Sequence, residues 1–136
     1  MKKNNKILIV SSNYYQDILH PMEEDTKIVL DNAKEIISNY QVLEAPGVFE
    51  IPVIISRNIE KYDGFVALGC VIKGETPHFD FISTAATDGI MKISIENKKP
   101  IGNGILTCLN KEQAEIRSKV KGKEAANALV SVLSQS

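Results

Sequence analysis

The 136-residue sequence lacks the features that mark metal-binding, secreted or membrane proteins. Its two cysteines, Cys70 and Cys108, form no CxxC pair and have no histidine at ligand spacing, so we expect small buried side chains there. No apolar run approaches the roughly 20 residues of a membrane helix. The apolar stretch at residues 7–10 is too short for a signal-peptide core. We therefore expect a cytoplasmic protein that does not bind membranes.

An excess of charge of one sign is also missing. The net charge is −1, which gives no general attraction to nucleic acid or to anionic membranes. Hydrophobic residues make up 43% and charged residues 24%, as in an ordinary globular protein. We expect a single domain over residues 1–136 and no nucleic-acid partner, so any phosphate must be bound by a local site.

Short apolar runs alternate with amphipathic stretches along the chain. Strands are predicted at residues 6–10, 41–45, 65–72 and 101–109. Helices are predicted in a segment ending near Asn39, then at residues 50–62 and 83–97, and at the end as two helices at about 111–119 and 123–133 that Gly122 separates. The first helix is inferred from helical spacing between Val29 and Tyr40, with Pro21 in or near its first turn.

This alternation predicts an α/β fold, an open and mainly parallel sheet with helices on both faces. The run at residues 65–72 is apolar at nearly every position, which is typical of a central strand. Ligands bind to such sheets outside the carboxyl ends of the strands. Three strand exits, at residues 11–15, 45–50 and 69–78, should therefore share one edge.

The third exit has the sequence GETPH and contains one of the two histidines. Gly74 allows a tight turn, and the helix that follows presents free N–H groups to an anion. His78 is well suited to proton transfer near neutral pH. The alternative is that Thr76 or Asp80 only caps the helix and that His78 is a solvent-facing turn residue.

The other two exits carry aromatic side chains. The second exit presents Val48, Phe49 and Glu50. The aromatic ring and the carboxylate could stack on a heterocycle and hydrogen-bond a polyol, unless Phe49 belongs to the core and Glu50 only to the first turn of the next helix. Tyr14 and Tyr15 are adjacent at a strand end, so one is expected to face the ligand edge and the other the core. For this exit alone, a plain turn is the alternative.

Two further features have both a functional and a structural interpretation. Arg117, one of two arginines, lies on a charged helix where it is either solvated or a phosphate ligand. Gly102 and Gly104 flank Asn103 in the fourth strand, where they allow close backbone approach or form a bulge.

Taken together, these segments resemble the 6,7-dimethyl-8-ribityllumazine synthase family. The matching stretches are PGVFEIP (46–52), LGCVIKGETPHFD (68–80), GNGILT (102–107) and EQAEIR (112–117), in the family's order and approximate spacing. The resemblance implies a flavodoxin-like three-layer α/β/α sandwich with a four-stranded sheet. It also implies condensation of 5-amino-6-(D-ribitylamino)uracil with 3,4-dihydroxy-2-butanone 4-phosphate, the penultimate step of riboflavin biosynthesis, without metal or organic cofactor.

The resemblance also assigns residue roles. His78 would transfer protons, and Glu75, Thr76 and Arg117 would bind the phosphate. The pyrimidine and ribityl chain would lie against Tyr14, Val48, Phe49, Glu50, Cys70, Val71, Ile72 and Asn103. Asn103 and Arg117 would come from a neighbouring subunit of a homopentamer, with or without further assembly into an icosahedral shell. Tyr14 and Asn103 depart from the family, which usually has Phe or Trp at the first position and often Phe at the second.

Two other functions compete with this one. A riboflavin synthase of the related archaeal type would share the fold but use two lumazine molecules. A flavin or lumazine carrier, or a shell-forming protein without activity, would need neither His78 nor the phosphate loop. The presence of both PGVFEIP and GETPHFD favours lumazine synthase.

Overall fold

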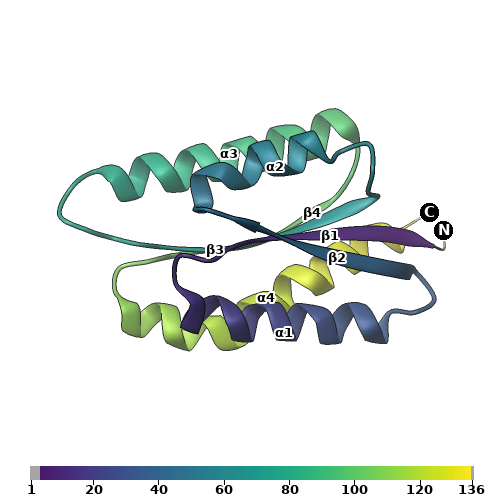
Figure 1. Cartoon of the computed structure of the whole chain (residues 1–136), viewed down its shortest axis with the longest axis horizontal. Helices are drawn as coiled ribbons and strands as arrows, with labels where there is room; N and C mark the ends of the chain where they lie inside the picture. Colours follow the sequence, from purple (N-terminus) through teal and green to yellow (C-terminus); the bar gives the residue numbers. More distant parts are fainter. Residues whose placement is uncertain (1–3, 136) are drawn as a thin grey trace.

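The computed structural model describes residues 4–135 as one four-stranded sheet between two layers of helices (Figure 1). The elements in chain order are β1 (Asn5–Ser12), α1 (Gln16–Asn32), β2 (Ile37–Ala45), the short 3-10 helix η1 (Val48–Glu50), α2 (Ile51–Arg57), β3 (Gly64–Ile72), α3 (His78–Asn97), β4 (Ile101–Cys108) and α4 (Lys111–Leu133). The strand order is β2-β1-β3-β4, and all three strand pairs are parallel. This confirms the predicted α/β/α sandwich, which is flavodoxin-like.

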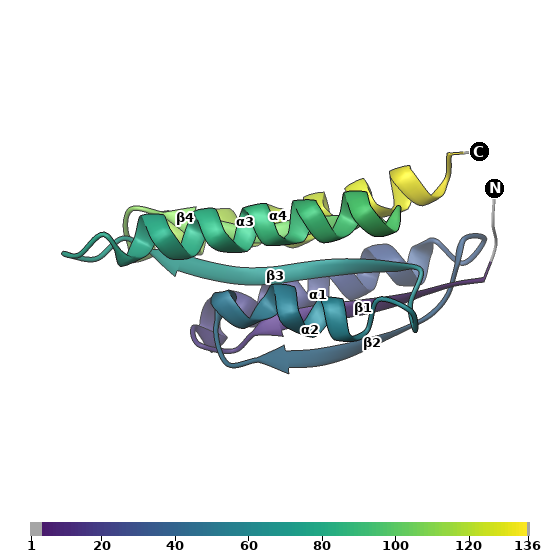
Figure 2. The ribbon, with the colours of Figure 1, turned by 90° about the horizontal axis from the view of Figure 1, so that it is seen from above.

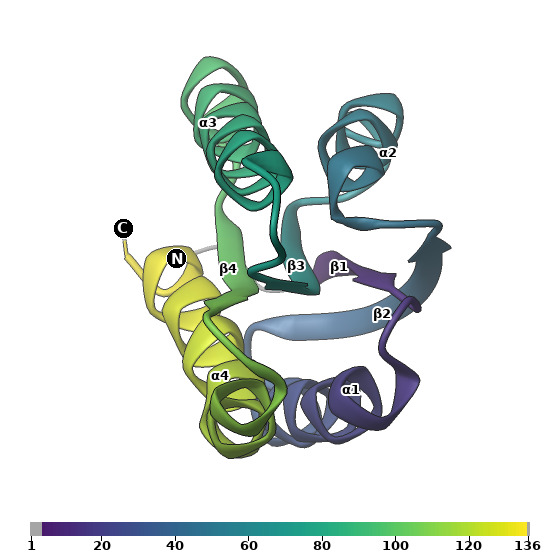
Figure 3. The same ribbon diagram turned by 90° about the vertical axis from the view of Figure 1, so that its left-hand side faces the viewer.

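The sheet has a hydrophobic core on each face. Helices α1 and α4 cover one face and α2 and α3 the other, as seen along the strands in Figure 3. Successive side chains of a strand alternate between the faces, so Ile7 and Ile9 pack with the first pair of helices, while Leu8 and Val10 pack with the second. Strand β3 is buried from Gly64 to Val71, which confirms the predicted central strand.

The strands all end at the same edge of the sheet. Figure 2 shows the arrowheads of β2 and β3 pointing to one end of the molecule, where the loops into α2 and α3 also begin. Strands β1 and β2 run in register up to the pair Ser12 and Ala45, so their exits lie side by side. This edge is the place where a parallel sheet is expected to bind its ligand.

The first predicted helix is wrong in its extent. Helix α1 ends at Asn32, and the residues from Ile37 onward form β2. Their apolar spacing resembled a helix by coincidence, and pairing with the whole length of β1 decides for a strand. Pro21 lies inside α1 in its second turn, which is near the first turn as predicted.

Three other helix boundaries also differ from prediction. Helix α2 ends at Arg57, where the Asn58 side chain donates a hydrogen bond to the carbonyl of Ile54 (2.8 Å) and the backbone leaves the helix. Helix α3 begins at His78 and not at Ser83. The two final helices are a single helix, α4, because Gly122 meets α1 at a close crossing instead of breaking the chain.

The glycines of β4 do not form a bulge. Strands β3 and β4 pair without interruption from Phe65 and Ile101 to Ile72 and Cys108. A Cβ at Gly102 would lie 2.3 Å from the carbonyl oxygen of Ala125 in α4. The glycine is therefore needed for the close approach of α4, which was the other interpretation of this segment.

Candidate active site

A cavity of about 450 Å³ opens at the carboxyl edge of the sheet. It is formed by all three predicted strand exits together with the first turns of α3. Its lining residues are Ser12, Tyr14, Tyr15, Gly47, Val48, Phe49, Glu50, Cys70, Val71, Ile72, His78 and Ile82. The cavity thus unites residues that are up to 70 positions apart in the sequence, since it extends from Ser12 to Ile82.

The exit of β1 contributes two tyrosines with different surroundings. Tyr14 is 73% exposed, whereas Tyr15 is half-buried and packs against the core on the side of α1 and α4. The two rings meet edge to face, with centroids 4.9 Å apart and an interplanar angle of 82°. Burial raises the pKa of Tyr15, so its hydroxyl stays protonated at neutral pH. Tyr14 thus lies at the ligand edge and Tyr15 packs against the core, as predicted, although Tyr15 also lines the cavity.

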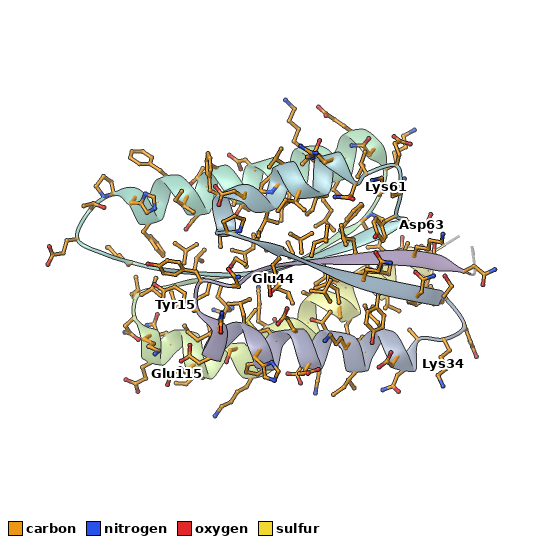
Figure 4. The ribbon with its side chains drawn as sticks, in the orientation of Figure 1. Tyr15, Lys34, Glu44, Lys61, Asp63 and Glu115 are labelled. Carbon is orange, nitrogen blue, oxygen red and sulfur yellow. The ribbon has the colours of Figure 1, made fainter. Side chains whose placement is uncertain are left out.

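Figure 4 shows that Tyr15, which lines the cavity, lies at one end of the sheet and that Asp63 lies at the other. There the Asp63 carboxylate accepts a hydrogen bond from the backbone N–H of Lys6 (2.9 Å). Asp63 therefore supports the start of β1 and is remote from the cavity.

The exit of β2 turns through η1 before α2 begins. Val48 is buried, whereas Phe49 is 58% exposed, so the alternative that Phe49 belongs to the core is wrong. Glu50 ends η1 and lines the cavity. A Cβ at Gly47 would lie 3.2 Å from the Glu50 carboxylate, which shows how closely this side chain follows the turn.

The exit of β3 supplies the inner wall. Cys70 is only 4% exposed, and burial raises the pKa of its thiol to about 12. It is therefore a neutral side chain at physiological pH and not a nucleophile. Val71 and Ile72 continue this apolar wall to the start of the loop.

His78 is the first residue of α3 and lines the cavity from an exposed position. Its backbone N–H donates a hydrogen bond to the Thr76 hydroxyl oxygen (3.4 Å). Thr76 therefore pairs one of the N–H groups that the first turn of α3 leaves free. Glu75 and Thr76 are exposed in the preceding loop and do not line the cavity. The hydrogen bond supports the capping alternative for Thr76, whereas His78 is exposed and is also part of the cavity wall.

Comparison with known proteins identifies the family. A family model described as 6,7-dimethyl-8-ribityllumazine synthase matches residues 4–136. This chain belongs to the 6,7-dimethyl-8-ribityllumazine synthase family. A synthase of this name from Agrobacterium fabrum is 39% identical, over 93% of this chain and 91% of the relative. One from Bartonella tribocorum is 36% identical, over 98% of this chain and 91% of the relative. Lumazine synthases are transferases, so the chain is an enzyme of that class.

Two residues that the lumazine synthase resemblance assigned to the site lie elsewhere on the chain. Asn103 is exposed on β4, where its side-chain oxygen accepts a hydrogen bond from the backbone N–H of Ile105 (3.0 Å). Arg117 is exposed on α4. Neither lines the cavity of its own subunit.

Four lining residues had no site role in the sequence analysis, although all but Ile82 lie in the predicted strand exits: Ser12, Tyr15, Gly47 and Ile82. Ile82 follows His78 by one helical turn, so its position could have been inferred from the correct start of α3. Ser12 is the last residue of β1 and could have been inferred from the rule that placed Tyr14.

Residues 4–135 contain neither a candidate metal cluster nor a candidate membrane helix. No three or more His, Cys, Asp or Glu side chains are grouped so that they could hold a metal ion. No helix in the same range combines the length and hydrophobicity needed to cross a bilayer.

Proposed function

We propose that this cavity condenses 5-amino-6-(D-ribitylamino)uracil with 3,4-dihydroxy-2-butanone 4-phosphate to form 6,7-dimethyl-8-ribityllumazine, as the penultimate step of riboflavin biosynthesis. The observation that carries the proposal is the composition of the cavity wall. It combines exposed aromatic rings (Tyr14 and Phe49), a carboxylate (Glu50), an apolar strand end (Cys70 to Ile72) and one imidazole (His78). These are the groups that a planar heterocycle with a polyol chain requires.

The reaction needs binding, orientation and proton transfer. The 5-amino group attacks the ketone carbon and forms an imine with loss of one water. Phosphate then leaves, and the ribityl-bearing nitrogen closes the second ring with loss of another water. Each step moves protons between nitrogen, oxygen and carbon, so a side chain placed to give and take protons accelerates it. His78 has this role in the proposal.

The pyrimidine is bound by the two aromatic side chains at the rim of the cavity, Tyr14 and Phe49, and by the Glu50 carboxylate. Tyr14 takes the place of the usual Phe or Trp of the family, and its ring retains a face for stacking. Val48, Phe49 and Glu50 hold the ribityl chain, and Cys70, Val71 and Ile72 form the wall behind the ring. Since Cys70 is neutral, this wall binds by shape and by backbone groups rather than by charge.

The phosphate is assigned to the loop before α3 and to a neighbouring subunit. Glu75 and Thr76 would bind it through the loop, and Arg117 would reach it from an adjacent copy, together with Asn103 on the pyrimidine side. Exposed apolar side chains on and beside α4 support a subunit contact there: Leu109 is 59%, Ile116 61% and Val120 51% exposed. We propose a cytoplasmic homopentamer in which each site takes groups from two copies.

The test is a direct assay. Purified protein is mixed with the two substrates, and lumazine formation is followed by absorbance and fluorescence against a control without protein. We expect a rate well above that of the spontaneous reaction. A rate equal to the control, with tight binding of lumazine or flavin, would show a carrier and overturn the proposal.

A further inference from the structure

Ser12 carries a buried hydroxyl that no group satisfies. The residue is 1% exposed at the end of β1, and its Oγ has no hydrogen-bond partner among residues 4–135. Leaving a buried hydroxyl unpaired is unfavourable, and nearly all buried polar atoms have a partner. The same residue lines the cavity of the candidate active site.

The surroundings of Ser12 on its own side of the sheet are apolar. The position that a Cβ on Gly69 would take lies 3.3 Å from the Ser12 Oγ, 2.6 Å from the Val48 Cγ2 and 3.3 Å from the Ile51 Cδ1. The hydroxyl and the two aliphatic side chains therefore all face the space above the Gly69 backbone. Along β1, the residues on the same face are Leu8 and Val10, both in the hydrophobic core.

Packing alone gives no reason for a hydroxyl at this position. Alanine would fill nearly the same volume and would leave no unpaired polar atom. Where a protein keeps a buried polar atom without a hydrogen-bond partner, the residue is expected to be functional. The cavity side is the open side, and rotation about the Cα–Cβ bond moves the Oγ between staggered positions without moving the strand.

We propose that Ser12 is a specificity-determining residue that hydrogen-bonds the ring edge of the heterocyclic substrate at the bottom of the cavity. Tyr14 and Phe49 form the exposed rim, so a ring that stacks on them directs an edge inward toward the end of β1. A hydroxyl both donates and accepts, which suits the carbonyl and N–H groups of a pyrimidine. The inference rests on the proposed function, because it names a contact to the same substrate.

The test compares Ser12→Ala with a matched control, Ser83→Ala. Ser83 in α3 also has a buried Oγ without a partner, but it does not line the cavity. We expect Ser12→Ala to raise the KM of the ribitylaminouracil and the Kd of lumazine, measured by fluorescence titration, about 2- to 10-fold. The KM of the butanone phosphate and kcat should stay within twofold. Ser83→Ala should leave all these constants unchanged.

The stability of the two variants makes the result unambiguous. Both remove an unpaired hydroxyl, so both should unfold at a Tm equal to or above that of the wild type. An unchanged KM and Kd in Ser12→Ala would overturn the proposal, as would a higher KM for the butanone phosphate alone. If the wild type forms no lumazine, the proposed function fails, while the Kd of lumazine still decides the role of Ser12. Absence of lumazine binding by the wild type would overturn that role too.

Discussion

Gly122 of α4 packs directly against the backbone of Met22 in α1. A Cβ on Gly122 would lie 2.4 Å from the carbonyl oxygen of Met22. The Thr26 hydroxyl lies 2.8 Å from the same oxygen and 3.3 Å from the carbonyl oxygen of Gly122. The buried Thr26 hydroxyl thus links the two backbones. The backbones can come this close because Gly122 has no side chain.

Gly122→Ala should therefore destabilise the protein, although alanine normally strengthens a helix interior. The methyl group would force the backbones apart, and such overpacking costs about 1–3 kcal/mol. The measurement is the free energy of unfolding in urea. Asn127→Ala, on an exposed part of the same helix, is the control and should be neutral or stabilising. Equal stability of the two variants would contradict the close crossing.

This crossing also shows why part of the fold could not be predicted from the sequence. A glycine between two amphipathic stretches commonly ends a helix, and only the contact with Met22, 100 positions away, explains its place inside α4. The border between α1 and β2 was predicted wrongly for a similar reason. The spacing from Val29 to Tyr40 is helical, yet pairing with β1 overrides it.

The position of the site could be predicted much more fully. Alternating strands and helices predict a parallel sheet, and that topology brings all strand exits to one edge. Tyr14, Phe49, Glu50 and His78 meet there although each alone had a plausible structural interpretation. The unpaired hydroxyl of Ser12 could not be predicted, because it depends on the packing of Val48 and Gly69 around it.

The buried thiol of Cys70 should make the folded state less stable at alkaline pH. Burial raises the pKa of its thiol from 9.0 to about 12. A raised pKa favours the folded state while the thiol is protonated, so this stabilisation is complete below pH 9 and is lost as the pH rises toward 12. The free energy of unfolding should therefore fall more steeply above pH 9 in the wild type than in Cys70→Ala. Parallel curves for the two proteins would show that the thiol contributes nothing.

His78→Ala should slow turnover about 10- to 100-fold and leave the Kd of lumazine nearly unchanged, because the imidazole moves protons rather than holding the ring. Steady-state rates and a lumazine titration measure the two effects. His20→Ala is the matched control. His20 is the only other histidine, on the exposed face of α1, and its substitution should change neither value. A His78→Ala rate equal to the wild-type rate would remove His78 from the mechanism.

Arg117→Ala should raise the KM of the butanone phosphate about 10- to 100-fold and change the KM of the ribitylaminouracil little. Hydrogen bonds from a guanidinium to a phosphate are charge-assisted and contribute about 1.5–3 kcal/mol. Arg57, the only other arginine, lies exposed in the last turn of α2 and provides the control Arg57→Ala. An equal loss for both substrates would show a structural effect instead of a phosphate contact.

The proposed sharing of each site between two subunits can be tested by mixing two variants. Arg117 does not line the cavity that contains His78, so in an assembly the two side chains of one site should belong to different subunits. His78→Ala and Arg117→Ala subunits, unfolded and refolded together, should then form some sites with both native residues. Activity of the mixture should exceed the mean of the two variants refolded separately. If each site used both residues of one chain, every site in the mixture would carry a substitution and the activity would equal that mean.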